Sequence, residues 1–165
     1  MKRKITLSQI VFFLYLLILT WFILFKLAIS VEEIPHIRDL NLRLFYNSYY
    51  KNGNVNWLEM GFNIIGFIPM GMYIALFKPE WNFLQKASLI PAISLAYESI
   101  QFIFSLGYTD ITDLLTNTTG GVLGIMIFNI LEYHMEEKTE SIINHLGIAA
   151  EVLIVGIYLL WRIVT

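Results

Sequence analysis

Acidic and amide side chains stand at regular intervals inside two neighbouring apolar stretches of the sequence. Asp110, Asp113 and Asn117 follow the spacing i, i+3 and i+7, which places them on one face of a helix. On the preceding apolar stretch, Glu98 and Gln101 share a helix face at the spacing i and i+3. Carboxylate and amide oxygens are hard ligands that suit Mg²⁺, and a carboxylic acid can also act as a general acid or base.

Two groups of residues make up the predicted site. The first group consists of acids that we expect to be catalytic residues and ligands of a divalent cation such as Mg²⁺: Glu98, Asp110 and Asp113. The second group is expected to bind the polar head of a ligand: Asn63, Gln101, Asn117 and Arg43. No nucleophile with a neighbouring base is evident in the sequence, so whether the protein is an enzyme stays open at this point.

The composition indicates a membrane protein. The chain of 165 residues is 57% hydrophobic with a mean hydropathy of +0.64, and its apolar residues come in long blocks. A formal net charge of −2 leaves no basic excess for nucleic acid, which we do not expect as a partner. The chain has no cysteine, so it can form neither a disulfide nor a thiolate metal site.

Five apolar stretches have about the length that a helix needs to cross a bilayer, which is about 20 residues. The predicted spans are residues 8–28, 60–77, 84–106, 111–131 and 147–164. No repeat or linker divides the sequence, so residues 1–165 are predicted to form a single all-α domain, a small bundle of about five transmembrane helices.

The basic residues predict the direction of the spans. Lys2, Arg3 and Lys4 precede the first span, and such clusters remain in the cytoplasm. An N-terminus inside and a C-terminus outside follow, with residues 29–58 as an external loop. The alternative, a cleaved signal peptide, is disfavoured because the first apolar run exceeds the usual apolar length of about 7–15 residues and carries Lys26 near its end.

With this topology the polar residues gather at one depth. If "SLGYT" is a turn that joins the third and fourth spans, Glu98 and Asn117 lie about 12 Å and about 9 Å below it on facing helices, at about 1.5 Å per residue. Asn63 lies near the external end of the second span. We therefore expect a polar pocket that opens outward. The alternative is a closed structural network in which Glu98 bonds to Asn117 and Gln101. Thr109 or Asp110 could also serve simply as a helix N-cap.

Gly120 and Gly124 in the fourth predicted span fit the GxxxG pattern, which allows helices to approach closely. We expect these glycines to pack a neighbouring helix of the same chain. The same face is also a possible surface for a homo-oligomer.

At these residues the chain resembles the VanZ family. The resemblance runs from "LTWFILFKL" through "DLNL" and "FNIIGFIPMG" to the specific motif "YESIQFIFSLGYTDITDLLTNTTGGVLG". It maps the polar signature of the family onto Asn63, Phe67, Pro69, Gly71, Glu98, Gln101, Asp110, Asp113, Asn117 and Gly121. The sequence departs from the family where many members have an arginine before the first aspartate and this chain has Gly107. It also has Leu44 in place of a proline.

The resemblance implies a protein of the bacterial plasma membrane that is linked to reduced susceptibility to teicoplanin-type lipoglycopeptides. For its action the sequence leaves three hypotheses. The site binds, and in an enzymatic version modifies, an amphiphilic envelope lipid, a lipid-linked intermediate or the antibiotic itself. Alternatively the protein is a scaffold that shields the target of the antibiotic, or a small transporter with Glu98 as proton carrier.

Overall fold

The structure is a computed structural model that describes residues 6–28, 30–34, 37–45, 50–51, 54–55 and 57–164. The described part contains the helices α1 (Leu7–Phe25), α2 (Trp57–Phe77), α3 (Phe83–Phe104), α4 (Ile111–Met135) and α5 (Thr139–Val164). Two short 3-10 segments are η1 (Val31–Glu33) and η2 (Glu136–Lys138). The strands are β1 (Ile37–Asn41), β2 (Tyr50–Lys51), β3 (Asn54–Val55) and β4 (Leu106–Asp110). The predicted all-α bundle is confirmed.

The helices suit a membrane. Among the described residues, α1, α2, α3 and the helical run Ile111–Val164, which contains α4 and α5, are long and apolar enough to cross a bilayer. Many of their large apolar side chains face outward, as lipid-facing residues do; on α5, for example, Val152, Leu160 and Ile163 are exposed. The protein is therefore a multi-span membrane protein.

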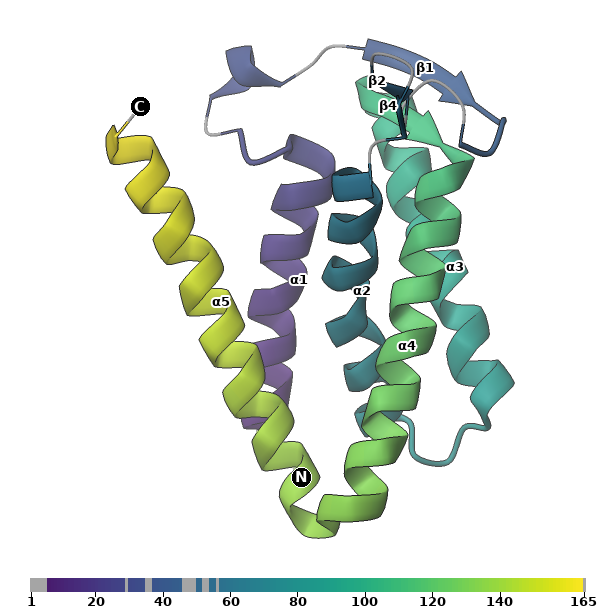
Figure 1. Ribbon diagram of the computed structural model, residues 1–165, viewed down its shortest axis with the longest axis vertical. Coiled ribbons are helices and arrows are strands. Elements are labelled where there is room, and N and C mark those ends of the chain that lie inside the picture. The colour runs from purple at the N-terminus through teal and green to yellow at the C-terminus, as the bar shows by residue number, and fades with distance from the viewer. Residues whose placement is uncertain are drawn as a thin grey trace, which may run out of the picture.

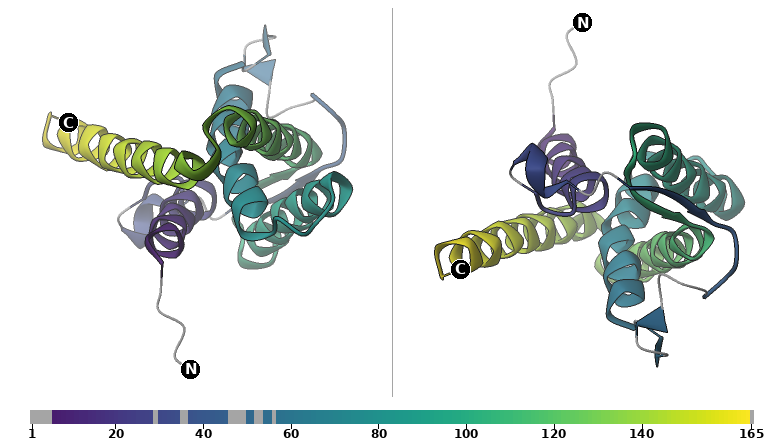
Figure 2. Two further views of the ribbon diagram at one scale, coloured as in Figure 1. Left: turned by 90° about the horizontal axis from the view of Figure 1, so that it is seen from below. Right: turned by 90° about the horizontal axis from the view of Figure 1, so that it is seen from above.

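The helices do not pack evenly. Figure 1 shows α2, α3 and α4 grouped together, with α1 beside them and α5 leaning away toward its C-terminal end. Both views in Figure 2 show α5 projecting from the bundle, and it contacts chiefly α1. The first residues of α1 and the last residues of α5 lie at opposite ends of the bundle (Figure 1). This arrangement fits an odd number of crossings, while the orientation in the cell stays a prediction. Lys2, Arg3 and Lys4, on which that prediction depends, lie outside the described residues.

Close contact between α2 and α4 depends on glycine. A Cβ atom added to Gly71 would lie 1.8 Å from the carbonyl oxygen of Gly121, and one added to Gly120 would lie 2.1 Å from that of Ile64. At Gly124 the same test gives 2.0 Å to the Ile68 carbonyl oxygen. The predicted packing role of the glycines is thus confirmed, and α2 is the helix that they admit. α2 covers the Gly120 and Gly124 face within the chain. The homo-oligomer that the sequence suggested stays a prediction.

The core lies between the grouped helices and α1. Its most deeply buried large side chains are at most 1% exposed, and they come from α2 and α3 as well as α4: Phe67, Met70, Tyr73, Ile90 and Ile125. This apolar core contains none of the residues of the predicted site.

The boundaries of several predicted elements change. The "SLGYT" segment is not a simple turn, because its last residues belong to β4, which pairs in parallel with β1 across the top of the bundle in Figure 1. α5 begins at Thr139 rather than at residue 147, so Glu151 lies near the middle of this helix. Residues 132–140, between the fourth and fifth predicted spans, are mostly helical and include η2.

Candidate functional site

Strand pairing places Asp110 at the centre of the predicted site. In the parallel register Asn41 of β1 lies opposite Asp110 of β4, and the Asn41 side-chain amide donates to Asp110 Oδ2 at 2.8 Å. The other carboxylate oxygen, Oδ1, accepts the backbone N–H of Thr112 at 2.8 Å and caps α4. Asp110 is only 1% exposed. The predicted N-cap role is confirmed, and the same carboxylate also anchors β1.

Glu98 joins α3 to this strand. Its Oε2 accepts the backbone N–H of Asp110 at 3.1 Å, and its backbone carbonyl accepts the hydroxyl of Thr109 at 3.3 Å. The side chain is 4% exposed. A carboxyl group so deeply buried in an apolar bundle is costly unless polar groups compensate it, and functional sites are where such groups are typically retained.

Asn63 and Asp113 form the outer part of the cluster. The Asn63 side-chain amide of α2 donates to Asp113 Oδ1 of α4 at 2.6 Å. Both side chains are half-buried, in contrast to Glu98 and Asp110. This pair therefore forms the less buried rim of the polar cluster.

Gln101 and Asn117 have different partners from those expected. The Gln101 amide nitrogen donates to the carbonyl oxygen of Ile23 in α1 at 3.0 Å, and the Asn117 amide nitrogen donates to Ser94 Oγ in α3 at 3.0 Å. The predicted hydrogen bond between Glu98 and Asn117 is therefore wrong, because Asn117 lies one turn deeper, at the level of Ser94. Within the described part of the chain the amide oxygens of Gln101 and Asn117 are buried without a hydrogen-bond partner.

The structure thus brings six of the predicted residues to one end of the bundle and leaves the seventh at its surface. Arg43 is exposed and follows β1, and its backbone N–H donates to the side chain of Asn41 at 3.1 Å. Arg43 also lies near the N-terminal end of α4. Two residues further along the chain, the backbone N–H of Phe45 donates to Thr112 Oγ1 in the first turn of that helix at 3.0 Å.

The predicted metal site is not assembled. Among the described residues no three His, Cys, Asp or Glu side chains are grouped so that they could hold a metal ion. The reason is visible in the hydrogen bonds, because Asp110 and Asp113 accept amide donors from Asn41 and Asn63, and Glu98 accepts a backbone N–H. Binding of a divalent cation by Glu98, Asp110 and Asp113 stays a prediction.

Three residues near the polar cluster were not predicted from the sequence. Asn41 stands in the "DLNL" segment, yet only the strand pairing reveals its contact with Asp110. Ser94 was overlooked as a small residue of an apolar span, although its spacing of four from Glu98 indicates the same helix face. Lys26 was treated as a residue of the span end. Its Nζ lies 3.5 Å from the point that a Cβ of Gly107 would occupy, so a cation stands beside the position where the resemblance suggested a missing arginine.

Arg38 of β1 holds the strand against the end of α3. Its Nε donates to the Phe102 carbonyl and to Ser105 Oγ, both at 3.1 Å, and its Nη2 donates to the Ile103 carbonyl at 2.8 Å. The Phe102 and Ile103 carbonyls belong to the last turn of α3, where carbonyls lack the usual N–H donor four residues ahead, and Ser105 is the C-cap. A cation is also favoured at a helix C-terminus. Arg38 therefore positions β1, and through it Asn41, next to the site.

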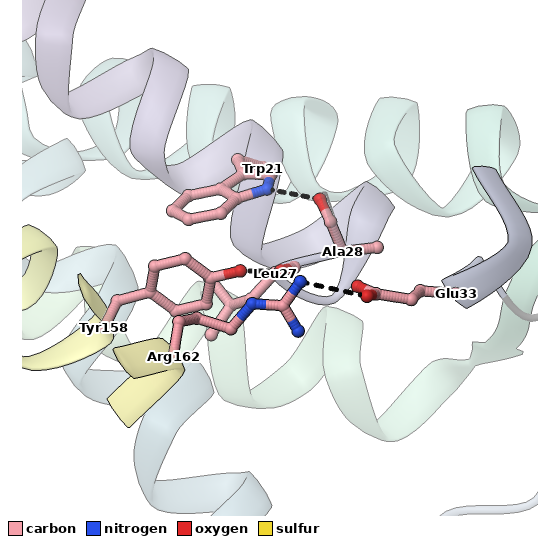
Figure 3. A network of polar contacts seen from close by, with 6 residues as sticks. All are labelled: Trp21, Leu27, Ala28, Glu33, Tyr158 and Arg162. Atoms are coloured by element: carbon pink, nitrogen blue, oxygen red, sulfur yellow. Dashed lines mark hydrogen bonds and ion pairs between the residues drawn. The ribbon is translucent and has the colours of Figure 1, made fainter. Parts of the chain in front are cut away.

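A second polar network ties the outer part of α5 to the segment after α1 (Figure 3). Tyr158 OH donates to the Leu27 carbonyl at 2.7 Å, and Arg162 pairs with Glu33 at 3.0 Å. Trp21 packs edge-on against Tyr158, with ring centres 4.6 Å apart. This network fixes α5 without contacting the residues of the predicted site.

The fold defines a multi-span α-helical membrane protein with a buried polar cluster at one end. The sequence profile of the VanZ/LLP1 family matches residues 12–132, which include all seven predicted site residues, and the chain belongs to this family. It is 40% identical over 144 residues to Protein VanZ of Enterococcus faecium, and the match covers 86% of each chain. No solved structure matches the chain significantly.

Proposed function

We propose that this membrane protein is associated with resistance to teicoplanin-type lipoglycopeptides and that its polar cluster binds the polar head of an amphiphilic cell-envelope molecule. The candidates are a membrane lipid, a lipid-linked envelope intermediate and the lipoglycopeptide itself. The family and the VanZ relative support the association with resistance. The polar cluster supports the binding role.

The observation that carries the proposal is the burial of acidic groups within an apolar bundle. Glu98 and Asp110 are at most 4% exposed; Glu98 belongs to α3, which is long and apolar enough to cross a bilayer, and Asp110 lies directly before α4. An acid in such a place lowers stability, and it is retained where it serves binding, transport or catalysis. Asn63 and Asp113 at the half-buried rim are placed to make the first contact with a ligand.

The surroundings suit a ligand with a polar head and an apolar tail. At the same end of the bundle, Leu42 and Leu44 are exposed on either side of Arg43, and Phe62 is exposed next to Asn63. Exposed apolar side chains at a membrane surface can contact an acyl chain, while the polar cluster takes the head. Arg43 supplies a positive charge to the phosphate or carboxylate that such molecules commonly carry.

Binding without covalent change is the form of the hypothesis that the contacts favour. The acids accept hydrogen bonds from amide groups, which hold them in place, and among the described residues the Glu98 carboxylate makes no hydrogen bond to a hydroxyl or thiol that it could activate. Chemical modification of the ligand, with Glu98 as acid or base, is the alternative that the experiment must separate.

The test compares antibiotic susceptibility in cells that express the wild-type chain, Glu98→Gln, Asp113→Asn or Asn117→Ala at equal membrane levels. We expect all three variants to lose protection against teicoplanin. Ser99→Ala is the control, because Ser99 is adjacent to Glu98 but faces away from the cluster and is exposed. Full protection in all three variants would contradict the proposal.

Two further measurements on the same cells identify the mode of action. Binding or shielding predicts that less antibiotic adsorbs to cells that express the wild type while the masses of envelope lipids stay unchanged. A new lipid or antibiotic mass that disappears in Glu98→Gln would instead assign a catalytic role to Glu98.

A further inference from the structure

We infer that the head group bound by the polar cluster is a primary ammonium, held between Glu98 and Gln101. The inference rests on the proposed function and specifies the chemical class of the ligand. It follows from the kind of hydrogen-bonding capacity that remains in the buried part of the site.

The buried polar atom that lacks a hydrogen-bond partner is an acceptor. Gln101 is 4% exposed, and within the described residues its Oε1 is buried without a hydrogen-bond partner. Its amide cannot be turned around, because its nitrogen donates to the Ile23 carbonyl at 3.0 Å and a carbonyl can only accept. A buried acceptor without a donor costs free energy, and a ligand that brings an N–H group removes that cost.

The spacing suits one ammonium group. Glu98 and Gln101 lie three residues apart on one face of α3, a rise of about 4.5 Å along the helix axis. An ammonium makes hydrogen bonds of about 2.8 Å in three directions, so one group can bond to two acceptors on adjacent turns of the same helix face. A single hydroxyl has one proton and can satisfy only one of them.

The charges also favour a cation. Two carboxylates, those of Asp110 and Asp113, are close enough to act electrostatically on Glu98, against one cation, the exposed Lys26 beside Gly107. A phosphate placed between Glu98 and Gln101 would meet a carboxylate and an acceptor oxygen, both of which repel it. The anionic part of a zwitterionic ligand would therefore remain near Lys26 and Arg43 at the surface.

The test measures lipid binding to the purified full-length protein by native mass spectrometry. Phosphatidylethanolamine, phosphatidylcholine and phosphatidylglycerol with identical acyl chains are added in equal amounts. We expect phosphatidylethanolamine to bind about tenfold more tightly than phosphatidylcholine, which keeps the positive charge but has no N–H donor. Equal binding of the two, as expected if water alone occupies the site, or a preference for phosphatidylglycerol would overturn the inference.

Two variants test whether Gln101 and Glu98 cause the preference for phosphatidylethanolamine. Gln101→Met removes the acceptor at similar length, and Glu98→Gln keeps the shape and an oxygen for the Asp110 N–H while removing the charge. Each is expected to abolish the preference for phosphatidylethanolamine, whereas Ser99→Ala keeps it. Thermal unfolding of every variant confirms that it is folded. A preference that survives in both folded variants would overturn the inference.

A second arm separates the two sources of a primary ammonium. A lipoglycopeptide with free amines and the same compound with acetylated amines are titrated in place of the lipids, and tighter binding of the free amine identifies the antibiotic as a ligand. If resistance depends on the cluster but neither pair shows an amine preference, the proposed function stands and this inference fails. If no ligand depends on the cluster, both fail.

Discussion

The amide nitrogen of Asn63 lies 2.6 Å from a carboxylate oxygen of Asp113, and this hydrogen bond joins α2 to α4 at the rim of the polar cluster. Because the two helices are also in backbone contact through their glycines, the rim is held by both packing and a polar bond. Variants of Asn63 and Asp113 therefore test how the cluster is held together.

We predict that Asn63→Ala and Asp113→Ala have non-additive effects on stability. A hydrogen bond to a charged group contributes about 1.5–3 kcal/mol, so the double variant should be more stable than the sum of the two single effects predicts, by about 1 kcal/mol or more. The free energy of unfolding in mixed micelles measures this coupling. Additive effects would show that the bond contributes nothing. Asn63→Asp, which places two carboxylates together, should be less stable than Asn63→Ala.

We predict that Gly124→Ala strongly destabilises the bundle. The added methyl group would lie 2.0 Å from the Ile68 carbonyl oxygen, so α2 and α4 must separate, at a cost of about 1–3 kcal/mol. Gly156→Ala is the matched control, because nothing lies within 4 Å of its added Cβ and alanine favours a helix by about 1 kcal/mol. Melting temperatures in detergent compare the two, and equal values would contradict the close helix contact.

We predict that Tyr158→Phe destabilises the attachment of α5 more than Arg162→Gln does. Tyr158 is 6% exposed and donates to the carbonyl of the half-buried Leu27, so removing its hydroxyl loses a partly buried hydrogen bond, at a cost of about 1 kcal/mol. The Arg162–Glu33 pair is partly exposed, with side chains 35% and 40% accessible, and such pairs contribute about 0–1 kcal/mol. The rate at which a protease cleaves α5 measures how firmly each variant holds the helix. Faster cleavage of Arg162→Gln than of Tyr158→Phe would contradict the prediction.

We predict that Asp39→Cys and Tyr108→Cys form a disulfide when combined. These residues lie opposite each other in the parallel register of β1 and β4, and both are exposed. The native chain has no cysteine, so the introduced pair has no competitor. A shift in gel mobility on oxidation detects the bond. Asp39→Cys with Tyr133→Cys, at the other end of the bundle, should not cross-link.

We predict that single cysteines report the orientation of the protein. Leu42 and Tyr133 are 68% and 82% exposed at opposite ends of the helical bundle. If the polar cluster faces outward, a membrane-impermeant maleimide added to intact cells labels Leu42→Cys and leaves Tyr133→Cys unlabelled. The opposite pattern would place the cluster on the cytoplasmic side and remove the proposed contact with external ligands.

Much of the site could be predicted from spacing alone. The spacing of Asp113 and Asn117 assigns both to α4, and the glycine spacing of α4 indicates close packing; Asp110, expected on the same helix face, instead ends β4 and caps the helix. Both signals are local, because helix geometry fixes which residues are neighbours within a few turns. The partners of these residues were less predictable, as the unexpected bond between Asn117 and Ser94 shows.

The sequence by itself determined that the chain forms apolar helices and that its acids and amides share helix faces, since hydropathy and helical periodicity are properties of neighbouring residues. Only the tertiary structure decided that β1 pairs with β4, that Asn41 holds Asp110 and that Lys26 stands beside Gly107. Each of these contacts joins segments that are far apart in the chain. Short strands and single side chains carry no local pattern that identifies a distant partner, so the assembled bundle must select it.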